Sequence, residues 1–84
     1  MNSIKEIVQI IKKLKTDSDI YNFLLEILTE SEVETLSKRW RILKMLNEGK
    51  TQREISKELN VSLCKVTRGS KIIKNKKSVI AKNL

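Results

Sequence analysis

The chain has 84 residues, of which 39% are hydrophobic and 33% are charged, a composition typical of one small globular domain. It contains no His, no Pro and a single Cys, which excludes a disulfide framework, a Cys/His zinc site and any catalytic dyad or triad that needs His. No long apolar run suggests a membrane span, and the first residues lack the apolar stretch of a signal peptide. We expect a cytoplasmic protein that is not an enzyme, with no catalytic residues, no metal ion and no cofactor.

The net charge of +8 lies entirely in the C-terminal part of the chain. Residues 1–49 contain eight Lys/Arg and eight Asp/Glu, whereas residues 50–84 contain ten Lys/Arg and only two acidic residues, Glu54 and Glu58. This asymmetry is typical of a surface for a polyanion, with nucleic acid the first candidate and an anionic membrane the second. A solvated basic tail is the alternative.

The spacing of apolar residues predicts helices throughout and no strands. A first helix over residues 4–14 has one apolar stripe, formed by Ile4, Ile7, Val8, Ile11 and Leu14. Asp17 or Ser18 is expected to cap a second helix. That helix would turn five apolar side chains inward: Ile20, Phe23, Leu24, Ile27 and Leu28.

A third helix is expected to start at a capping box formed by Thr29 and Glu32. It would end near Glu48, because Gly49 readily adopts the left-handed conformation that terminates helices. One side of this helix is expected to be buried and to carry Val33, Leu36, Trp40, Leu43 and Leu46.

A second capping box, Thr51 with Glu54, predicts the start of a fourth helix. The last ten residues are expected to fray. We therefore expect one all-α domain, a small helical bundle over residues 1–84, divided into dimerisation and core helices (1–48), a helix-turn-helix (51–74) and a basic tail (75–84).

Residues 52–71 have the layout of a DNA-binding helix-turn-helix. Asn60 stands at the turn position that requires positive φ, Ser56 is small where the helices cross, and Ser62 can cap the second helix. Four apolar residues fall where the two helices must pack together: Ile55, Leu59, Val61 and Val66. A plain helical hairpin is the alternative, but the unbalanced charge falls on this segment and favours DNA.

In such a motif the start of the second helix, from Ser62 onward, enters the major groove. Lys65 and Arg68 are long enough to reach guanine O6 and N7, whereas Leu63 or Cys64 can touch a thymine methyl. The remaining expected DNA contacts are made mainly to phosphates, by Thr51, Gln52, Arg53, Thr67, Lys71 and Lys74.

The apolar stripe of the first helix has little core to cover within one chain, which favours a homodimer. Folding back onto the same chain is the alternative. A two-fold dimer would read two half-sites of a palindromic operator about one helical turn apart.

Several segments together resemble the bacterial Trp repressor family over roughly residues 24–74. They are Leu28-Thr29, Ser37-Lys38-Arg39-Trp40-Arg41-Ile42, Glu48-Gly49, Thr51-Gln52-Arg53-Glu54-Ile55 and Thr67-Arg68-Gly69-Ser70. The resemblance implies an intertwined all-helical homodimer that represses transcription with L-tryptophan as corepressor. It also implies that Arg39 and Arg68 flank the indole ring, that the backbone at Thr29 receives the ammonium group, and that Gly69 lies against the ligand.

Three features depart from the family pattern. Glu26 stands where the family has an apolar pocket residue, and Glu30 replaces a common proline. The connection over residues 49–52 is one residue shorter than in tryptophan-responsive members and is similar to a sister branch with no assigned tryptophan response. The prediction is a DNA-binding repressor with tryptophan or a related aromatic effector. Two alternatives are a family member that does not respond to tryptophan and a helical interaction module that does not bind DNA.

Overall fold

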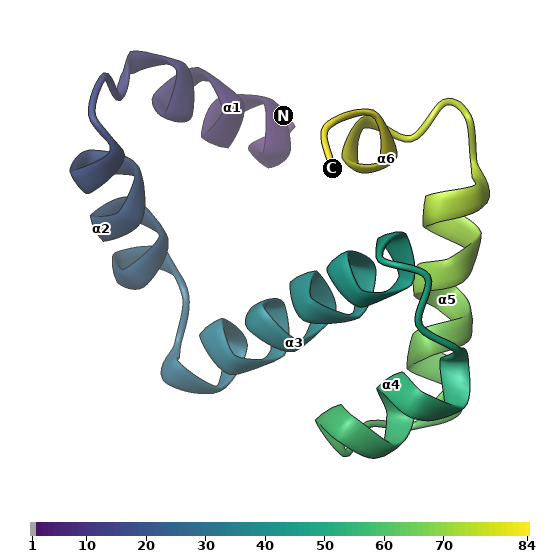
Figure 1. Cartoon of the computed structure of the whole chain (residues 1–84). Helices are drawn as coiled ribbons and strands as arrows, with labels where there is room; N and C mark the ends of the chain where they lie inside the picture. The colour runs from purple at the N-terminus through teal and green to yellow at the C-terminus, as the bar shows by residue number, and fades with distance from the viewer. Residues whose placement is uncertain (1) are drawn as a thin grey trace. The chain divides into compact units, whose positions relative to one another are not determined.

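The computed structural model describes residues 2–84, and every regular element among them is an α-helix, which confirms the all-α class (Figure 1). The described chain forms two compact units whose boundary lies inside the third helix, one up to Val33 and one from Glu34 onward. No helix among residues 2–84 is long and apolar enough to cross a bilayer. The helices are α1 (Ser3–Lys13), α2 (Asp17–Ile27), α3 (Glu30–Asn47), α4 (Gln52–Leu59), α5 (Leu63–Lys74) and α6 (Val79–Lys82).

In the first unit, short polar side chains start both α1 and α2. The Asn2 side chain accepts a hydrogen bond from the Lys5 amide at 3.2 Å, and the Thr16 hydroxyl accepts one from the Asp19 amide at 3.1 Å. The prediction that Asp17 or Ser18 caps α2 is therefore wrong. Thr16 has the extended backbone of a cap (φ −119°, ψ 152°), and Asp17 lies in the first turn, where a carboxylate interacts favourably with the helix dipole.

The apolar side chains of α1 and α2 are largely uncovered. Ile4 is 69% exposed and Ile27 is 51% exposed, and neither helix has a buried residue. The prediction that α2 turns its five apolar residues inward is wrong for the single chain, in which only Phe23 and Leu28 are half-buried. Two short helices give too little surface to cover each other's apolar faces.

The ends of α3 follow the prediction, whereas its buried side follows it only in part. Thr29 and Glu32 form the expected capping box, with bonds of 2.9 and 3.1 Å, and Gly49 has φ 90° after the helix ends. Leu36 and Trp40, expected inside, are each 46% exposed. Leu43 is buried as predicted, and Val33 and Leu46 are half-buried. The other two buried residues of α3, Ile42 and Met45, were not predicted.

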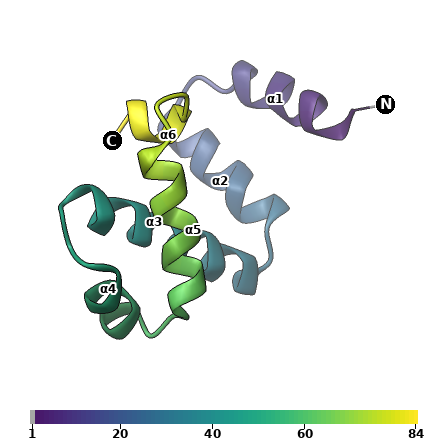
Figure 2. The same cartoon turned by 90° about the vertical axis from the view of Figure 1, so that its right-hand side faces the viewer.

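The core of the second unit lies where α3, α4 and α5 meet. Ile55 of α4 and Val66 of α5 have no solvent exposure. They pack with Ile42 and Met45 of α3, and three partly buried residues complete the cluster: Leu46, Leu59 and Val61. Figure 2 shows α5 passing in front of α3.

Gly69 lets α5 approach α3 closely. A Cβ atom at this position would lie 2.9 Å from Cγ2 of Ile42 and 3.3 Å from Cδ1 of Leu46. The absence of a side chain at this buried glycine therefore permits the close packing of the two helices.

The C-terminal residues, expected to fray, instead form a turn and the short helix α6, which contacts α5. The Asn75 side chain accepts a hydrogen bond from the Lys77 amide at 2.9 Å, and the Ser78 hydroxyl accepts one from the Ala81 amide at 3.1 Å. Ala81 and Leu84 are half-buried. These local bonds and contacts give the segment a defined path.

Candidate nucleic-acid interface

The α4–α5 turn has the geometry that a helix-turn-helix requires. Asn60 adopts the left-handed conformation (φ 53°, ψ 51°), as its position in the sequence predicts. The Val61 amide donates to the Ser56 carbonyl at 3.1 Å, and the Ser56 hydroxyl donates back to the Val61 carbonyl at 2.6 Å. Ser62 then caps α5 by accepting a bond from the Lys65 amide. Two reciprocal hydrogen bonds between Ser56 and Val61 thus close the turn.

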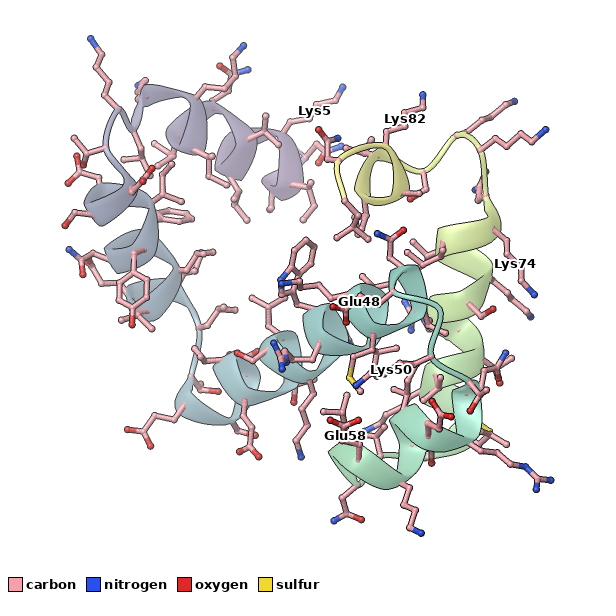
Figure 3. The ribbon with its side chains drawn as sticks, viewed as in Figure 1. Lys5, Glu48, Lys50, Glu58, Lys74 and Lys82 are labelled. Carbon is pink, nitrogen blue, oxygen red and sulfur yellow. The ribbon has the colours of Figure 1, made fainter. Side chains whose placement is uncertain are left out.

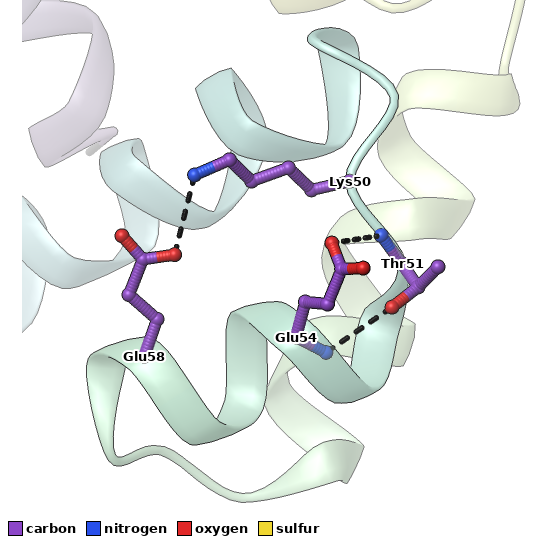
Figure 4. A network of polar contacts seen from close by, with 4 residues as sticks. All are labelled: Lys50, Thr51, Glu54 and Glu58. Carbon is purple, nitrogen blue, oxygen red and sulfur yellow. Dashed lines mark hydrogen bonds and ion pairs between the residues drawn. The ribbon is translucent and has the colours of Figure 1, made fainter.

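The start of α4 is held by the expected capping box. Thr51 and Glu54 each accept a hydrogen bond from the other's backbone amide, at 3.2 and 3.3 Å (Figure 4). The amides of Gln52 and Arg53, at the first two positions of the helix, have no carbonyl within the helix to bond. These two donors, together with the helix dipole, are available to an anion such as a phosphate.

An ion pair links the α3–α4 connection to the C-terminal end of α4. Nζ of Lys50 lies 3.2 Å from a carboxylate oxygen of Glu58, as Figure 4 shows. Both side chains are about half exposed, so the pair contributes little stability.

A side-chain hydrogen bond joins the start of α4 to the second turn of α5. The Thr67 hydroxyl lies 2.9 Å from Oε1 of Gln52 and 3.0 Å from the carbonyl oxygen of Leu63. When Oε1 of Gln52 accepts from Thr67, the amide nitrogen of the same side chain is directed away from that bond. Gln52 and Thr67 were each expected to contact phosphates separately, and the bond between them is not evident from the sequence, because it joins residues fifteen positions apart.

The solvent face of α5 is basic along its whole length. Four cations recur every three residues, and at 3.6 residues per turn they wind around the half of the helix that lies away from Val66, Gly69 and Ser70. Among the described residues, none of these cations forms an ion pair with a carboxylate. They are Lys65, Arg68, Lys71 and Lys74, and all are exposed.

The other residues expected at the DNA surface are also accessible. Leu63 is 46% exposed, and Cys64 presents a free thiol on the exposed side of α5. Thr51, Arg53 and Ser62 are exposed, and Gln52 is half-buried beside Thr67. The second unit therefore gathers all of the predicted DNA-contact residues on α4, α5 and their caps.

The four residues implied for corepressor binding do not lie in one unit. Thr29 belongs to the first unit, where its carbonyl accepts a bond from the Val33 amide at 2.9 Å. Arg39, Arg68 and Gly69 belong to the second unit. Both arginines are exposed, whereas Gly69 is buried against α3.

Comparisons with known proteins find one family and several relatives of the same name. The family model described as Trp repressor protein matches residues 2–84. The chain is 34% identical over 74 residues to a protein named Trp operon repressor homolog from Chlamydia caviae, covering 87% of this chain and 73% of the relative. It is 49% identical over 59 residues to a protein of the same name from Xylella fastidiosa, covering 67% of this chain and 64% of that relative. No solved structure matches.

Proposed function

The chain belongs to the Trp repressor family, whose members are DNA-binding regulators, and from this we propose that it represses transcription as a homodimer on a palindromic operator, with L-tryptophan as corepressor.

The observation that carries the proposal is the solvent face of α5. A helix that follows a closed three-residue turn presents four cations and no acidic residue to solvent. A duplex carries one phosphate charge per about 1.7 Å of its axis, so such a surface gains affinity by releasing counterions.

Specific positions on α5 suit specific DNA groups. Lys65 and Arg68 lie in the first half of the helix, where side chains of a recognition helix reach base edges. Leu63 and Cys64 offer apolar atoms to a thymine methyl. The free amides at the start of α4, with Thr51, Gln52 and Arg53, suit one phosphate, and Thr67, Lys71 and Lys74 suit others.

Uncovered apolar side chains support the homodimer. Ile4, Val8 and Leu25 on α1 and α2, and Trp40 on α3, are all between 45% and 69% exposed. Burial against a second copy would remove this apolar surface from water, at roughly 25 cal/mol per Å².

Two exposed guanidinium groups support a corepressor that has both an aromatic ring and a carboxylate. Arginine stacks on aromatic rings and binds carboxylates, and Arg39 and Arg68 are accessible for both. L-Tryptophan has both groups. A ligand held by Arg68 would act on the helix that carries Lys65, and so would favour the DNA-competent arrangement.

One observation favours a family member that does not respond to tryptophan. The space beside Gly69 is filled by Ile42 and Leu46 of the same chain, so close packing of α5 on α3 is itself a reason for a glycine at this position. Glu26 is exposed and adds a negative charge where the family has an apolar residue. In this candidate function the DNA-binding role is unchanged.

The DNA-binding part is tested by selecting duplexes from a random library and then measuring the affinity for the selected site as salt is varied. The affinity should fall steeply, with a log–log slope of about −0.9 per phosphate contact. Arg68→Ala should weaken binding strongly, whereas Lys12→Ala, which removes an equal charge from α1, should have little effect. Weak binding with no salt dependence would instead indicate an interaction module that does not bind DNA.

The corepressor is tested by isothermal titration calorimetry with L-tryptophan at several temperatures. We expect binding near one ligand per chain, lost in Arg39→Ala. If no heat is detected while the selected duplex is still bound, the tryptophan-independent function is correct. Analytical ultracentrifugation of the same samples tests the homodimer.

A further inference from the structure

Three lysines beyond the helix-turn-helix have no partner in the second unit. Lys76 and Lys77 lie in the turn between α5 and α6, and Lys82 ends α6. All three are exposed, and among the described residues none pairs with a carboxylate. We call these residues the tail lysines.

The tail lysines are held on a folded segment. The Asn75 side chain fixes the Lys77 amide, the Ser78 hydroxyl caps α6, and the Asn83 side chain donates to the Val79 carbonyl at 2.7 Å. α6 also contacts α5. The lysines therefore lose less freedom on binding a ligand than lysines of a free chain end would.

Helix stabilisation explains the cations at the end of α5 but not those in the turn. Lys71 and Lys74 lie in the last turn of α5, where cations interact favourably with the helix dipole. Lys76 and Lys77 lie after that helix and before α6. Adjacent positive charges repel one another, and no acidic residue follows Glu58 to offset them. Such a cluster of unbalanced cations is typical of a surface that binds a polyanion.

The tail lysines lie too far along α5 to contact the same bases as Lys65. The twelve residues of α5 span about 18 Å at a rise of about 1.5 Å per residue, which exceeds both the width of the major groove, about 12 Å, and its depth, about 8.5 Å. A recognition helix that lies in the groove leads its C-terminal end back to the phosphates at the groove edge. In Figure 3 the Lys74 and Lys82 side chains extend from α5 and α6 away from the ribbon.

We propose that Lys76, Lys77 and Lys82 form a second DNA surface, independent of sequence, that binds backbone phosphates next to the half-site read by α5. This inference rests on the proposed DNA-binding function. It extends the DNA-binding residues beyond the helix-turn-helix, and it assigns a role to the folded tail.

The test compares two duplexes, the selected site alone and the same site with about twenty extra base pairs on each side, a length that gives flanking phosphates over about two helical turns. The wild-type chain should bind the longer duplex more tightly and with a steeper salt dependence. K76Q/K77Q/K82Q should lose this gain, and its log–log slope should be shallower by about 0.9 for each contact removed. Restoring the charge with K76R/K77R/K82R should restore the slope.

A matched control separates a local surface from net charge. K5Q/K12Q/K15Q removes three exposed lysines from the first unit and changes the net charge equally. An equal loss in this control, or no change in K76Q/K77Q/K82Q, would overturn the inference while the proposed function stands. A wild-type chain that binds neither duplex with steep salt dependence would overturn both. Circular dichroism should show the same helix content and melting temperature for each variant.

Discussion

Gly69→Ala tests how closely α5 packs on α3. The added Cβ would lie 2.9 Å from Cγ2 of Ile42, nearer than carbon atoms ordinarily approach. Ile42 is only 3% exposed, and its Cγ2 is bound directly to Cβ of a β-branched side chain, which has little freedom to rotate away. We therefore expect the backbone of one helix to shift.

Two opposing effects set the size of the change. Overpacking a core by one methyl group typically costs about 1–3 kcal/mol. Replacing Gly by Ala inside a helix stabilises it by about 1 kcal/mol. The net result should be a loss of roughly 1 kcal/mol, which lowers the melting temperature of a domain of this size by about 4–8 °C.

Substitutions at Ile42 separate the two effects. Ile42→Leu removes the Cγ2 methyl, so Gly69→Ala in that background should be clearly less destabilising, because the remaining tight contact, 3.3 Å, is with Cδ1 at the end of the flexible Leu46 side chain and the gain in helix propensity offsets it. Ile42→Val keeps Cγ2 and serves as the matched control, in which Gly69→Ala should stay destabilising. The measurement is urea unfolding followed by circular dichroism at one fixed protein concentration, since association would otherwise change the apparent stability. Equal effects of Gly69→Ala in all three backgrounds would refute the close contact.

Further predictions concern the turn and the two helices that it joins. Asn60→Ala should cost about 1 kcal/mol in urea unfolding because alanine tolerates φ 53° poorly, whereas Asn60→Gly should be nearly neutral; equal losses would show that the backbone conformation is not the cause. Thr67→Val should lose about 0.5–1.5 kcal/mol of stability with its bond to Gln52, and Thr67→Ser should retain it; equal melting temperatures for all three would contradict the bond. Lys65→Ala should change which duplexes a random library yields, and a uniform loss of affinity would assign Lys65 to a phosphate instead.

The helix-turn-helix was predictable from sequence because its signals are local. Thr51 with Glu54, Asn60, and Ser62 each bond to groups within four residues, so the identity of the residue determines the geometry. The apolar residues at the positions where the two helices must pack then place Ile55 and Val66 in the core.

The buried side of α3 was only partly predictable because the helix is apolar on more than one side. Leu36 and Trp40 share one face, whereas Ile42 and Met45 lie on another, and periodicity alone does not tell which of the two α4 and α5 cover. The capping residue of α2 was missed for a similar reason, since Thr16, Asp17 and Ser18 are consecutive and all are common caps. The roles of Arg39, Arg68 and Thr29 toward a corepressor remain predictions.

Cys64 gives the protein a single site for thiol-specific labelling. It is the one cysteine in the sequence, and its thiol is exposed at the second residue of α5. A maleimide dye would therefore attach at one known point without the removal of any other thiol. Because this point lies among the exposed cations of α5, the dye's emission would report directly on whatever approaches that face.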